Sequence, residues 1–415
     1  MGERRNGESR DTEARLDEAA GLAEAIGIEV AGRLHFKIRQ PKPGTLFGSG
    51  QVQMIADEIA SSEAELLIVD ASITPIQQKN LETGTKAKVI DRTGLILEIF
   101  GERAATAEGR LQVELAHLDY QAGRLVRSWT HLERQRGGFG FLGGPGETQI
   151  EADRRLIRDR MAKLKKELEQ VTRTRGLHRA RRQRAPWPVI ALVGYTNAGK
   201  STLFNRLTRA DVMAENLLFA TLDPTMREVV LPGFDKAILS DTVGFISELP
   251  TQLVAAFKAT LEEVISADLI IHVRDISHAD SEAQRGDVEH VLAEIGASRE
   301  GGAPLIEAWN KIDAVDPEEA DRVRAEAVRR EDVMVISALQ GDGVDRLMAC
   351  AADHLRKGAK VRSVIVDATD GEAMAWLHAH GEVIEQVQDG LETRYEVRLS
   401  DSDWARFESR QADGA

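Results

Sequence analysis

The segment from Gly194 to Ser201 reads Gly-Tyr-Thr-Asn-Ala-Gly-Lys-Ser and fits the phosphate-binding pattern G-x-x-x-x-G-K-[ST] in full. The apolar run 189–193 before it predicts a buried strand, and residues 201–207 after it predict a helix with one apolar side. In such a loop the glycines let successive backbone N–H groups point at one anion, and the helix N-terminus adds a positive potential. We therefore predict that Lys200 reaches the β- and γ-phosphates of a nucleotide and that the Ser201 hydroxyl binds Mg²⁺.

A second motif, N-K-x-D at residues 310–313, indicates which nucleotide base the site binds. It follows the apolar run 304–309, at the predicted end of a strand. A buried carboxylate of Asp313 would accept hydrogen bonds from the N1–H and 2-amino groups of guanine, a pair of donors that adenine lacks. We expect Asn310 to tie this loop to the phosphate loop and the stem of Lys311 to cover the base. The sequence thus predicts a site for GTP.

Two further segments complete the predicted site. Residues 241–244 read Asp-Thr-Val-Gly after a strand-like run. An aspartate there can hold Mg²⁺ through water, and a glycine lets the backbone N–H approach the γ-phosphate. Upstream, Thr221 and Thr225 are both candidates to close over Mg²⁺ and the γ-phosphate, and their spacing does not choose between them. The last segment, Ser337-Ala338-Leu339, would place a backbone N–H near the guanine oxygen.

The residue that follows Gly244 bears on how GTP is hydrolysed. Many related GTPases carry a glutamine there that orients the attacking water. This chain has Phe245 followed by Ile246, and neither side chain can polarise water. We therefore expect another residue, the backbone or a partner to hold the water, and we predict slow intrinsic hydrolysis that a partner accelerates.

Together these motifs resemble the G domain of translation-factor-type GTPases over residues 187–357. That resemblance implies a doubly wound α/β sheet with the nucleotide at the carboxyl ends of the strands. The alternation of apolar runs and helical segments supports the same fold. The runs predict strands near 189–193, 228–231, 237–240, 269–273, 305–309 and 333–336.

Charge and composition bound the remaining possibilities. The chain has 415 residues, a net charge of −14 and 42% hydrophobic residues, so it is long enough for several domains with true cores. The single cysteine, Cys350, excludes an internal disulfide, is expected to pack in a core, and fits a reducing cytoplasm. We expect no membrane span, because no apolar stretch approaches ~18 residues. Scattered histidines suggest no metal beyond Mg²⁺.

A basic strip departs from this acidic average. Residues 151–184 are rich in arginine and lysine and predict a helix, which is expected to pair with 111–120 as a helical hairpin. A solvated linker helix is the alternative, but the concentration of positive charge favours contact with RNA or a ribosome. The predicted apolar face comprises Leu156, Ile157, Met161, Leu164, Leu168 and Val171.

A glycine-rich segment precedes this helix at 137–149. We expect a flexible loop, because so many glycines favour neither helix nor strand. It carries Phe139, Phe141 and Leu142, with Arg134 and Arg136 just upstream. Aromatic rings between Gly and Arg can stack on unpaired bases, so we favour an interaction loop over a plain linker.

The two ends of the chain form smaller units. In the N-terminal part, strands are expected at 29–36, 66–69 and 88–90, with helices after Ser49 and Pro75. The glycine-rich element 44–50 lacks the lysine of a phosphate loop, so a second nucleotide site there is disfavoured. The tail predicts a small α+β unit from strands near 361–366 and 395–399 around a helix at 372–380.

Several long motifs, taken in order, resemble the HflX GTPase family. They lie at 44–50, 89–97, 144–149, 219–225 and 241–246, and the resemblance spans about residues 28–357. Members of that family bind the large ribosomal subunit and split 70S ribosomes. The resemblance implies that the glycine-rich loop and basic helices reach the peptidyl-transferase region, and that Ser201 and Thr221 bind Mg²⁺. Some members also bind ATP through the N-terminal domain, but Gln51 stands where relatives often carry lysine, which weakens that role here.

The expected function is therefore a GTPase that binds the 50S subunit and its 23S rRNA and dissociates stalled or idle 70S ribosomes, with hydrolysis stimulated by the ribosome. A large-subunit assembly GTPase and an ATP-driven RNA remodelling enzyme are the alternatives. We expect a monomer in the cytoplasm, associated with ribosomes, with peripheral membrane contact left open. The expected fold is multidomain α/β: an N-terminal α/β domain (13–133), a Gly-rich loop (134–150), a basic helical arm (151–186), a doubly wound P-loop G domain (187–357) and a small α+β C-terminal domain (358–415).

The predicted site divides by role. Lys200, Thr221 and Gly244 are expected to act in catalysis, and Ser201, Thr221 and Asp241 to hold Mg²⁺. The residues expected to contact GTP or GDP are Gly194, Tyr195, Thr196, Asn197, Ala198, Gly199, Lys200, Ser201, Thr202, Phe219, Ala220, Thr221, Leu222, Asp223, Asp241, Thr242, Val243, Gly244, Asn310, Lys311, Asp313, Ser337, Ala338 and Leu339.

Overall fold

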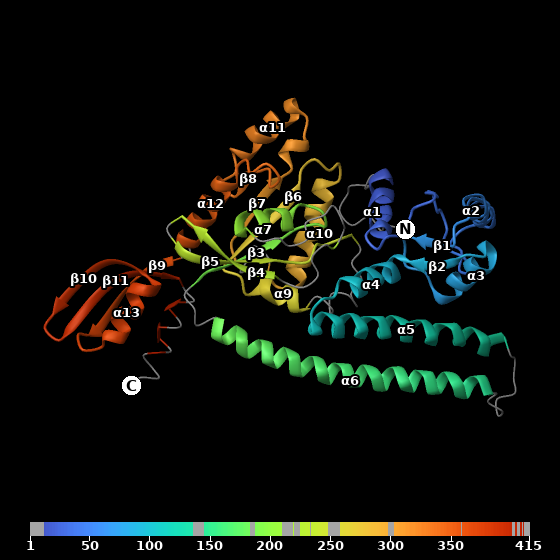
Figure 1. Ribbon diagram of the computed structural model, residues 1–415, viewed down its shortest axis with the longest axis horizontal. Coiled ribbons are helices and arrows are strands. Elements are labelled where there is room, and N and C mark those ends of the chain that lie inside the picture. Colours follow the sequence, from blue (N-terminus) through green and yellow to red (C-terminus); the bar gives the residue numbers. More distant parts are fainter. Residues whose placement is uncertain are drawn as a thin grey trace.

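The computed structural model describes residues 12–135, 145–182, 187–209, 219, 225–232, 234–247, 258–297, 303–357, 359–400, 403–404, 407–408 and 410. An N-terminal α/β domain lies on one side of a central α/β domain and a small C-terminal domain on the other, and a long helical arm runs below the first two (Figure 1). The predicted multidomain α/β fold is thus confirmed. None of the helices in these ranges is long and apolar enough to cross a membrane.

The N-terminal domain is built on a short parallel sheet in which β1 pairs with β2, Leu67 opposite Val89. Residues 29–36, predicted as a strand, do not form one. A strand needs a neighbour for its backbone groups, and in the part of the chain described here β1 and β2 pair with each other and leave 29–36 outside the sheet. The elements are α1 (Thr12–Glu24), α2 (Ser49–Ser62), β1 (Leu66–Val69), α3 (Pro75–Thr85), β2 (Lys88–Asp91) and α4 (Arg92–Arg103).

The glycine-rich element at 44–50 serves as a helix start. Gly48 is the N-cap of α2, and its N–H donates to Oε1 of Gln51 at 2.9 Å. Gln51 therefore satisfies an end group of the helix at the position where a lysine would be needed for phosphate. This local role agrees with the expectation that the element is no second phosphate loop.

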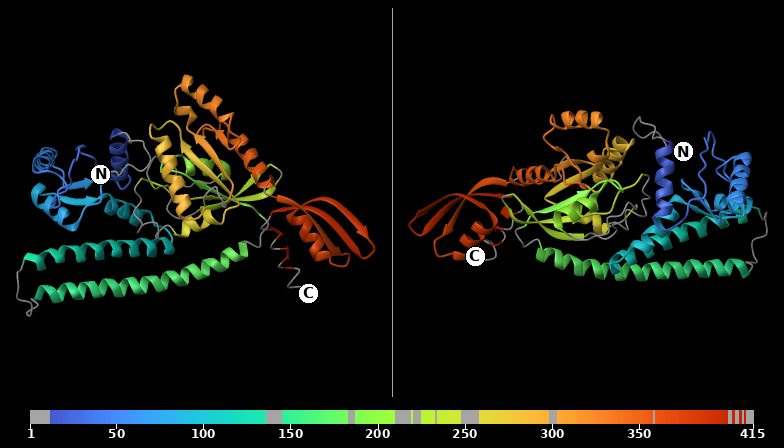
Figure 2. Two further views of the ribbon diagram at one scale, coloured as in Figure 1. Left: turned by 180° about the vertical axis from the view of Figure 1, so that it is seen from behind. Right: turned by 45° about the horizontal axis from the view of Figure 1, so that its top comes forward.

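The arm is a helical hairpin of α5 (Ala107–Gln135) and α6 (Pro145–Arg182), which run side by side in both orientations of Figure 2. Leu164 is fully buried, and Arg160 of α6 pairs with Glu114 of α5 at 2.6 Å. Leu156, one of the apolar residues at near-heptad spacing, does not belong to the packed face, since its side chain is 66% exposed. Ile157, which is partly buried, lies on the side of α6 that carries Leu164, and the side chain of Leu156 is turned by about 100° from that of Ile157.

Helix α6 begins earlier than predicted. Residues 145–150, expected as part of the glycine-rich loop, are already helical. Proline is well suited to the first position of a helix, where its missing N–H costs no hydrogen bond, and Pro145 occupies it. Residues 137–144, with Phe139 and Phe141, lie outside the described residues.

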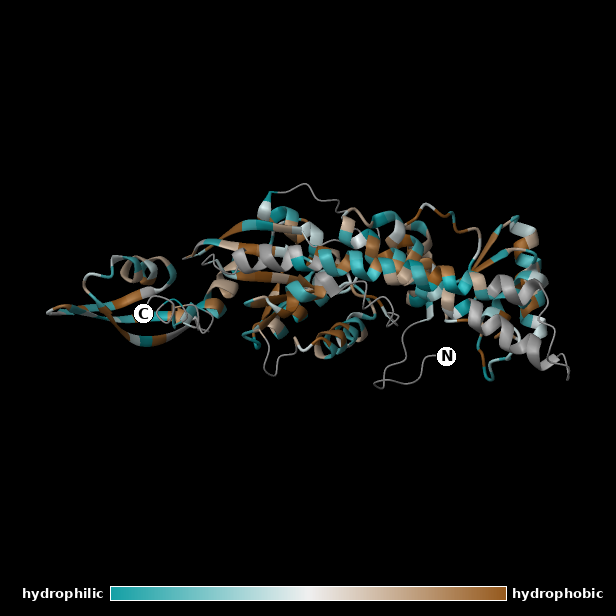
Figure 3. Cartoon of the chain, turned by 90° about the horizontal axis from the view of Figure 1, so that it is seen from below, coloured by the Kyte–Doolittle hydropathy of each residue, from teal (hydrophilic) through white to brown (hydrophobic). Residues whose placement is uncertain are grey.

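The central domain is a sheet in the order β4-β5-β3-β6-β7-β8, with β4 antiparallel and the other neighbours parallel. Its strands are mostly brown in Figure 3, the hydrophobic end of the scale, as expected for a sheet covered on both faces. The predicted strands are confirmed. The elements are β3 (Val189–Val193), α7 (Lys200–Thr208), β4 (Thr225–Leu231), β5 (Phe234–Asp241), α9 (Lys258–Ile265), β6 (Leu269–Asp275), α10 (Ser281–Glu294), β7 (Leu305–Asn310), the short 3-10 helix η1 (Ile312–Ala314), α11 (Pro317–Ala327), β8 (Val333–Val335) and α12 (Val344–Lys357).

The C-terminal domain is an antiparallel sheet in the order β10-β11-β9, covered by one helix. Strand β10 was missed in the sequence because polar residues fill it, and its apolar Ile384 and Val387 are about half exposed at 47% and 48%. The elements are β9 (Ala359–Asp367), α13 (Gly371–His380), β10 (Glu382–Asp389) and β11 (Glu392–Ser400).

Candidate functional site

The phosphate-binding loop lies where the sequence predicted it, between the end of β3 and the start of α7. Gly194 has a φ of +153°, and a Cβ there would lie 2.2 Å from the carbonyl oxygen of Val273. Gly199 has a φ of +94°, and its Cβ would lie 2.2 Å from Nδ2 of Asn310. Both glycines are therefore required by the shape of the loop as well as by its backbone angles.

Lys200 is buried at the floor of this loop. Its Nζ donates to the carbonyl oxygens of Gly194 at 3.1 Å and Tyr195 at 2.8 Å. Burial lowers the pKa of Lys200 to about 8, although the negative charge of Asp241 acts in the opposite direction. The ammonium is thus held inside the loop with little water around it, where an anion would gain most from its charge.

Ser201 and Asp241 meet beside Lys200. The Ser201 hydroxyl donates to Oδ2 of Asp241 at 2.7 Å, which brings two of the predicted Mg²⁺ ligands together. These are oxygen donors, which Mg²⁺ prefers, and Mg²⁺ commonly takes only one or two protein ligands besides phosphate and water. The adjacent Thr242 has a structural role, since its hydroxyl donates to the carbonyl of Leu192 at 2.6 Å and fastens β5 to β3.

The two predicted base-binding segments converge on Asn310. Its Nδ2 donates to the carbonyl of Ala198 at 2.8 Å, and its Oδ1 accepts from the N–H of Ala338 at 2.8 Å. The prediction that Asn310 ties its loop to the phosphate loop agrees with this geometry. In the structure the Ala338 N–H faces this amide, while Ser337 is fully buried and Leu339 is 70% exposed.

Asp313 lies differently from the sequence expectation. Asp313 is on η1 and is exposed, whereas we expected a buried carboxylate. Within η1, Ile312 is buried and Asp313 faces solvent, so burial of the Asp313 carboxylate would have to come from a bound base. The Lys311 ammonium pairs with Asp275 at the end of β6, at 2.8 Å.

The sequence matches those of known relatives along most of their length. The chain is 52% identical over 375 residues to the GTPase HflX of Magnetococcus marinus, covering 90% of this chain and 85% of that protein. It is 40% identical over 393 residues to the GTPase HflX of Escherichia coli, covering 94% and 91%.

The chain belongs to the GTPase HflX family.

Family models agree with this assignment along the chain. Residues 13–101 match the model "GTP-binding GTPase N-terminal", 103–182 "GTP-binding GTPase Middle Region", 189–311 "50S ribosome-binding GTPase" and 322–415 "HflX C-terminal domain". Among solved structures, a GTP-binding protein from Sulfolobus solfataricus in complex with GDP is 27% identical, covering 82% of this chain and 95% of that one, with a TM-score of 0.43. Its GTPase family model and its HflX relatives show that the chain is a GTP-binding enzyme that hydrolyses GTP.

One residue of the HflX site escaped the sequence analysis. The Arg206 guanidinium, on α7, donates from Nε to the carbonyl of Ala338 at 2.6 Å and from a terminal nitrogen to the carbonyl of Leu339. It packs against Gly341, whose φ of +99° turns the chain there. An arginine on an amphipathic helix carries no local signal for such a contact, because its partners lie more than a hundred residues away.

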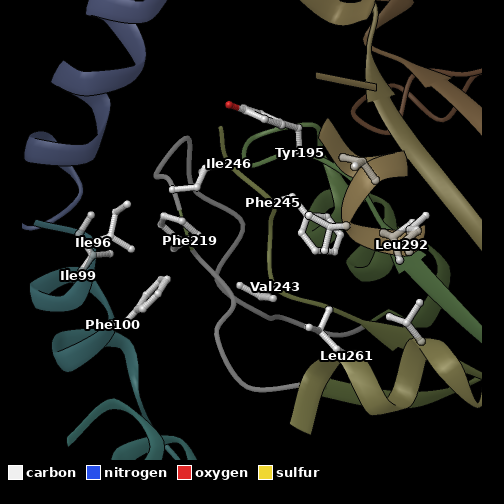
Figure 4. Packing of buried hydrophobic residues seen from close by; sticks show 14 of the residues in the cluster. Ile96, Ile99, Phe100, Tyr195, Phe219, Val243, Phe245, Ile246, Leu261 and Leu292 are labelled. Atoms are coloured by element: carbon white, nitrogen blue, oxygen red, sulfur yellow. The ribbon is translucent and has the colours of Figure 1, made fainter. Parts of the chain in front are cut away.

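The residues on either side of Gly244 pack against the N-terminal domain. Val243, Phe245 and Ile246 are almost fully buried at 1–2% exposure, and Figure 4 shows them facing the same cluster as Ile96, Ile99 and Phe100 of α4. Phe245 is therefore part of a hydrophobic wall. Phe219 and Thr225 are the described members of the predicted segment 219–225. Thr225 is the first residue of β4, and the ring of Phe219 meets that of Phe100 edge-on at 4.8 Å between centroids. Ala220, Thr221, Leu222 and Asp223 lie outside the described residues.

Proposed function

We propose that this HflX family GTPase binds the 50S ribosomal subunit through its 23S rRNA and dissociates stalled or idle 70S ribosomes when GTP is bound, with hydrolysis stimulated by the ribosome. The observation that carries the proposal is the arm. Helix α6 holds twelve Lys and Arg against six Asp and Glu in a chain whose net charge is −14. Its Arg155, Arg158, Lys165 and Lys166 are exposed, so the charge lies on the surface.

The arm is joined to a domain whose family model is described as a 50S ribosome-binding GTPase. A concentrated basic strip attracts phosphate backbones within about 10 Å even when the whole protein is acidic. The long helical hairpin therefore offers an RNA-binding surface, and the G domain beside it offers a nucleotide-dependent switch.

The proposal assigns a role to each of the site residues. In this proposal the loop 194–201 holds the phosphates, with Lys200 paired to the β- and γ-oxygens and the backbone N–H of Gly244 facing the γ-phosphate. Ser201 and Asp241 would hold Mg²⁺, with Thr221 as a further ligand, and the ion would neutralise charge that develops on the phosphates. Asp313 would bind the guanine edge, and Asn310 would keep the base and phosphate loops in register.

Sedimentation of 70S ribosomes with the protein and a non-hydrolysable GTP analogue tests the function. We expect the 70S peak to be lost and the protein to migrate with 50S subunits. An intact 70S peak with the protein at the top of the gradient would contradict the proposal and favour an assembly or remodelling role. Reversing the charge of Lys165 and Lys166 to glutamate should abolish splitting, whereas the same reversal at exposed Arg322 and Arg329 of the G domain should not.

The pKa of Lys200 predicts how nucleotide affinity changes with pH. Because burial lowers this pKa to about 8, the ammonium loses its proton as the pH rises through that value, and GDP should bind about fourfold more weakly at about pH 8.5 than at about pH 7. The free energy of unfolding moves the other way: the cost of burying the charge is present below pH 8 and is relieved as the pH rises toward the unfolded pKa of 10.5. Calorimetric titration with GDP measures the first effect. The Lys200→Arg variant, which stays protonated, should bind weakly but without this pH dependence.

Arg206 is predicted to support the base-binding loop. Lysine cannot make both of the hydrogen bonds that Arg206 donates to the turn at 338–339. The Arg206→Lys variant should bind GDP about tenfold more weakly, while inorganic pyrophosphate, which has no base, should bind within about twofold of its normal affinity. The matched control is Arg209→Lys, at the exposed end of the same helix. Equal losses for GDP and pyrophosphate would contradict a role confined to the base.

A further inference from the structure

A ring of partly buried hydrogen bonds joins the N-terminal domain to the phosphate loop. The Tyr195 hydroxyl, on the phosphate loop, donates to Oε2 of Glu18 on α1 at 2.6 Å. The Ser247 hydroxyl donates to Oε1 of the same carboxylate at 2.8 Å. The backbone N–H of Ser247 donates to the Tyr195 oxygen at 2.7 Å and closes the ring. In Figure 4 the Tyr195 hydroxyl points away from the strands of the G domain.

Arg92, the first residue of α4, holds this carboxylate in place. Its guanidinium pairs with Glu18 and Asp70 and also donates to the hydroxyl of Ser247 at 2.9 Å and to its carbonyl at 3.2 Å. Burial alone raises the pKa of Glu18, but the charge of Arg92 and the hydrogen bonds from Tyr195, Arg92 and Ser247 hold it below its usual value. Glu18 is thus an anion with a full set of donors.

The ring adjoins the backbone of residues 244–247, which the proposed function places near the γ-phosphate. The N–H of Thr196 donates to the carbonyl of Phe245 at 2.7 Å, and the N–H of Phe245 donates to the carbonyl of Gly194 at 3.1 Å. Residues 244–247 therefore lie against the phosphate loop through their backbone, and the ring fixes the far end of that contact. A Cβ on Gly244 would lie 2.8 Å from Cα of Thr196 and 3.1 Å from Nζ of Lys200, so the backbone is packed too closely there for a side chain.

We propose that Glu18, held by Arg92, is a positioning residue of the GTPase reaction. Through Tyr195 and Ser247 it fixes the backbone of Gly244 for the γ-phosphate, so the N-terminal domain completes the catalytic site. The proposal rests on the proposed role of Gly244. Phe245 stands where many GTPases carry a catalytic glutamine. A site without that glutamine depends on accurate placement of the backbone around the γ-phosphate, which the ring would provide.

The test removes the Tyr195 hydroxyl with little change of shape. In Tyr195→Phe, single-turnover GTP hydrolysis should slow by about tenfold, and the affinity for GTPγS should fall relative to that for GDP, with the GDP affinity unchanged within about twofold. Tyr120→Phe is a matched control, because the Tyr120 hydroxyl donates to Oδ1 of Asp91 at 2.6 Å entirely within the N-terminal part of the chain. This control should hydrolyse GTP at the normal rate.

A double-mutant cycle adds a readout that general destabilisation would not produce. Glu18→Gln should slow hydrolysis, and combining it with Tyr195→Phe should add little, because both variants break the same ring. Independent, multiplicative effects would overturn the proposal. So would a Tyr195→Phe rate equal to that of Tyr120→Phe, or a raised rate, which would show that the ring restrains the site.

The Gly244→Ala variant distinguishes a failure of the positioning proposal from a failure of the role assigned to Gly244. If Gly244→Ala hydrolyses GTP normally, the role given to Gly244 fails and the positioning proposal fails with it. If Gly244→Ala is inactive while Tyr195→Phe behaves like its control, the role of Gly244 stands and only the positioning proposal is overturned. Thermal melts of all variants identify any that do not fold, and Ser247→Ala, which removes one donor from the ring, then replaces Tyr195→Phe.

Discussion

Replacing Asp313 with asparagine is expected to change the preferred base from guanine to xanthine. Guanine presents its N1–H and 2-amino donors to a carboxylate, and an amide can accept only one of them while its own NH₂ faces the other. Xanthine carries an oxygen at position 2, which can accept from that NH₂. We expect GDP to bind about 10³-fold more weakly and xanthosine diphosphate to become the better ligand.

Fluorescence titration with labelled GDP and xanthosine diphosphate measures this exchange. Asp316→Asn is the matched control: Asp316 lies three residues on and caps α11 by accepting from the N–H of Glu318 at 3.0 Å. It should leave both affinities unchanged. GDP binding by Asp313→Asn within about tenfold of normal would show that the base is recognised elsewhere.

Gly244→Ala is expected to slow GTP hydrolysis by about a hundredfold while GDP still binds. The added methyl group would overlap Cα of Thr196, a backbone atom that cannot rotate away, and would press on Nζ of Lys200. The segment must therefore move, and its N–H moves away from the proposed position of the γ-phosphate. Single-turnover hydrolysis and GDP titration separate the two effects.

Gly286→Ala gives the control for this glycine. Gly286 lies within α10, and a Cβ there meets nothing within 4 Å. That variant should hydrolyse GTP normally and gain about 1 kcal/mol of stability from the better helix propensity of alanine. Normal hydrolysis by Gly244→Ala would refute the close approach that we assign to this residue.

The parts of the site that were predicted correctly are those whose chemistry is local. A phosphate loop needs glycines, a lysine and a following helix within a few residues, so the sequence alone predicts its place between β3 and α7. The same holds for the strands of the G domain, whose apolar runs are nearly continuous because both faces of the sheet are covered.

The parts that were missed depend on which segments meet in space. Arg206 and Glu18 look like ordinary charged residues on helices, and their partners lie 132 and 229 residues away. Residues 29–36 have the composition of a strand but no neighbouring strand in the described part of the sheet. The exposed side chain of Leu156 shows that an apolar residue next to a heptad position does not belong to the seam.

The ring around Glu18 also limits how modular this protein can be. Two domains that share only a flexible linker can be exchanged between relatives or produced separately. Here a carboxylate of one domain accepts hydrogen bonds from the phosphate loop and from Ser247 of the other. In a chimera whose foreign N-terminal domain has no acid at the position of Glu18, both domains should fold, but GTP hydrolysis should be slower than in the natural chain. Glu18 and Tyr195 should also vary together during evolution.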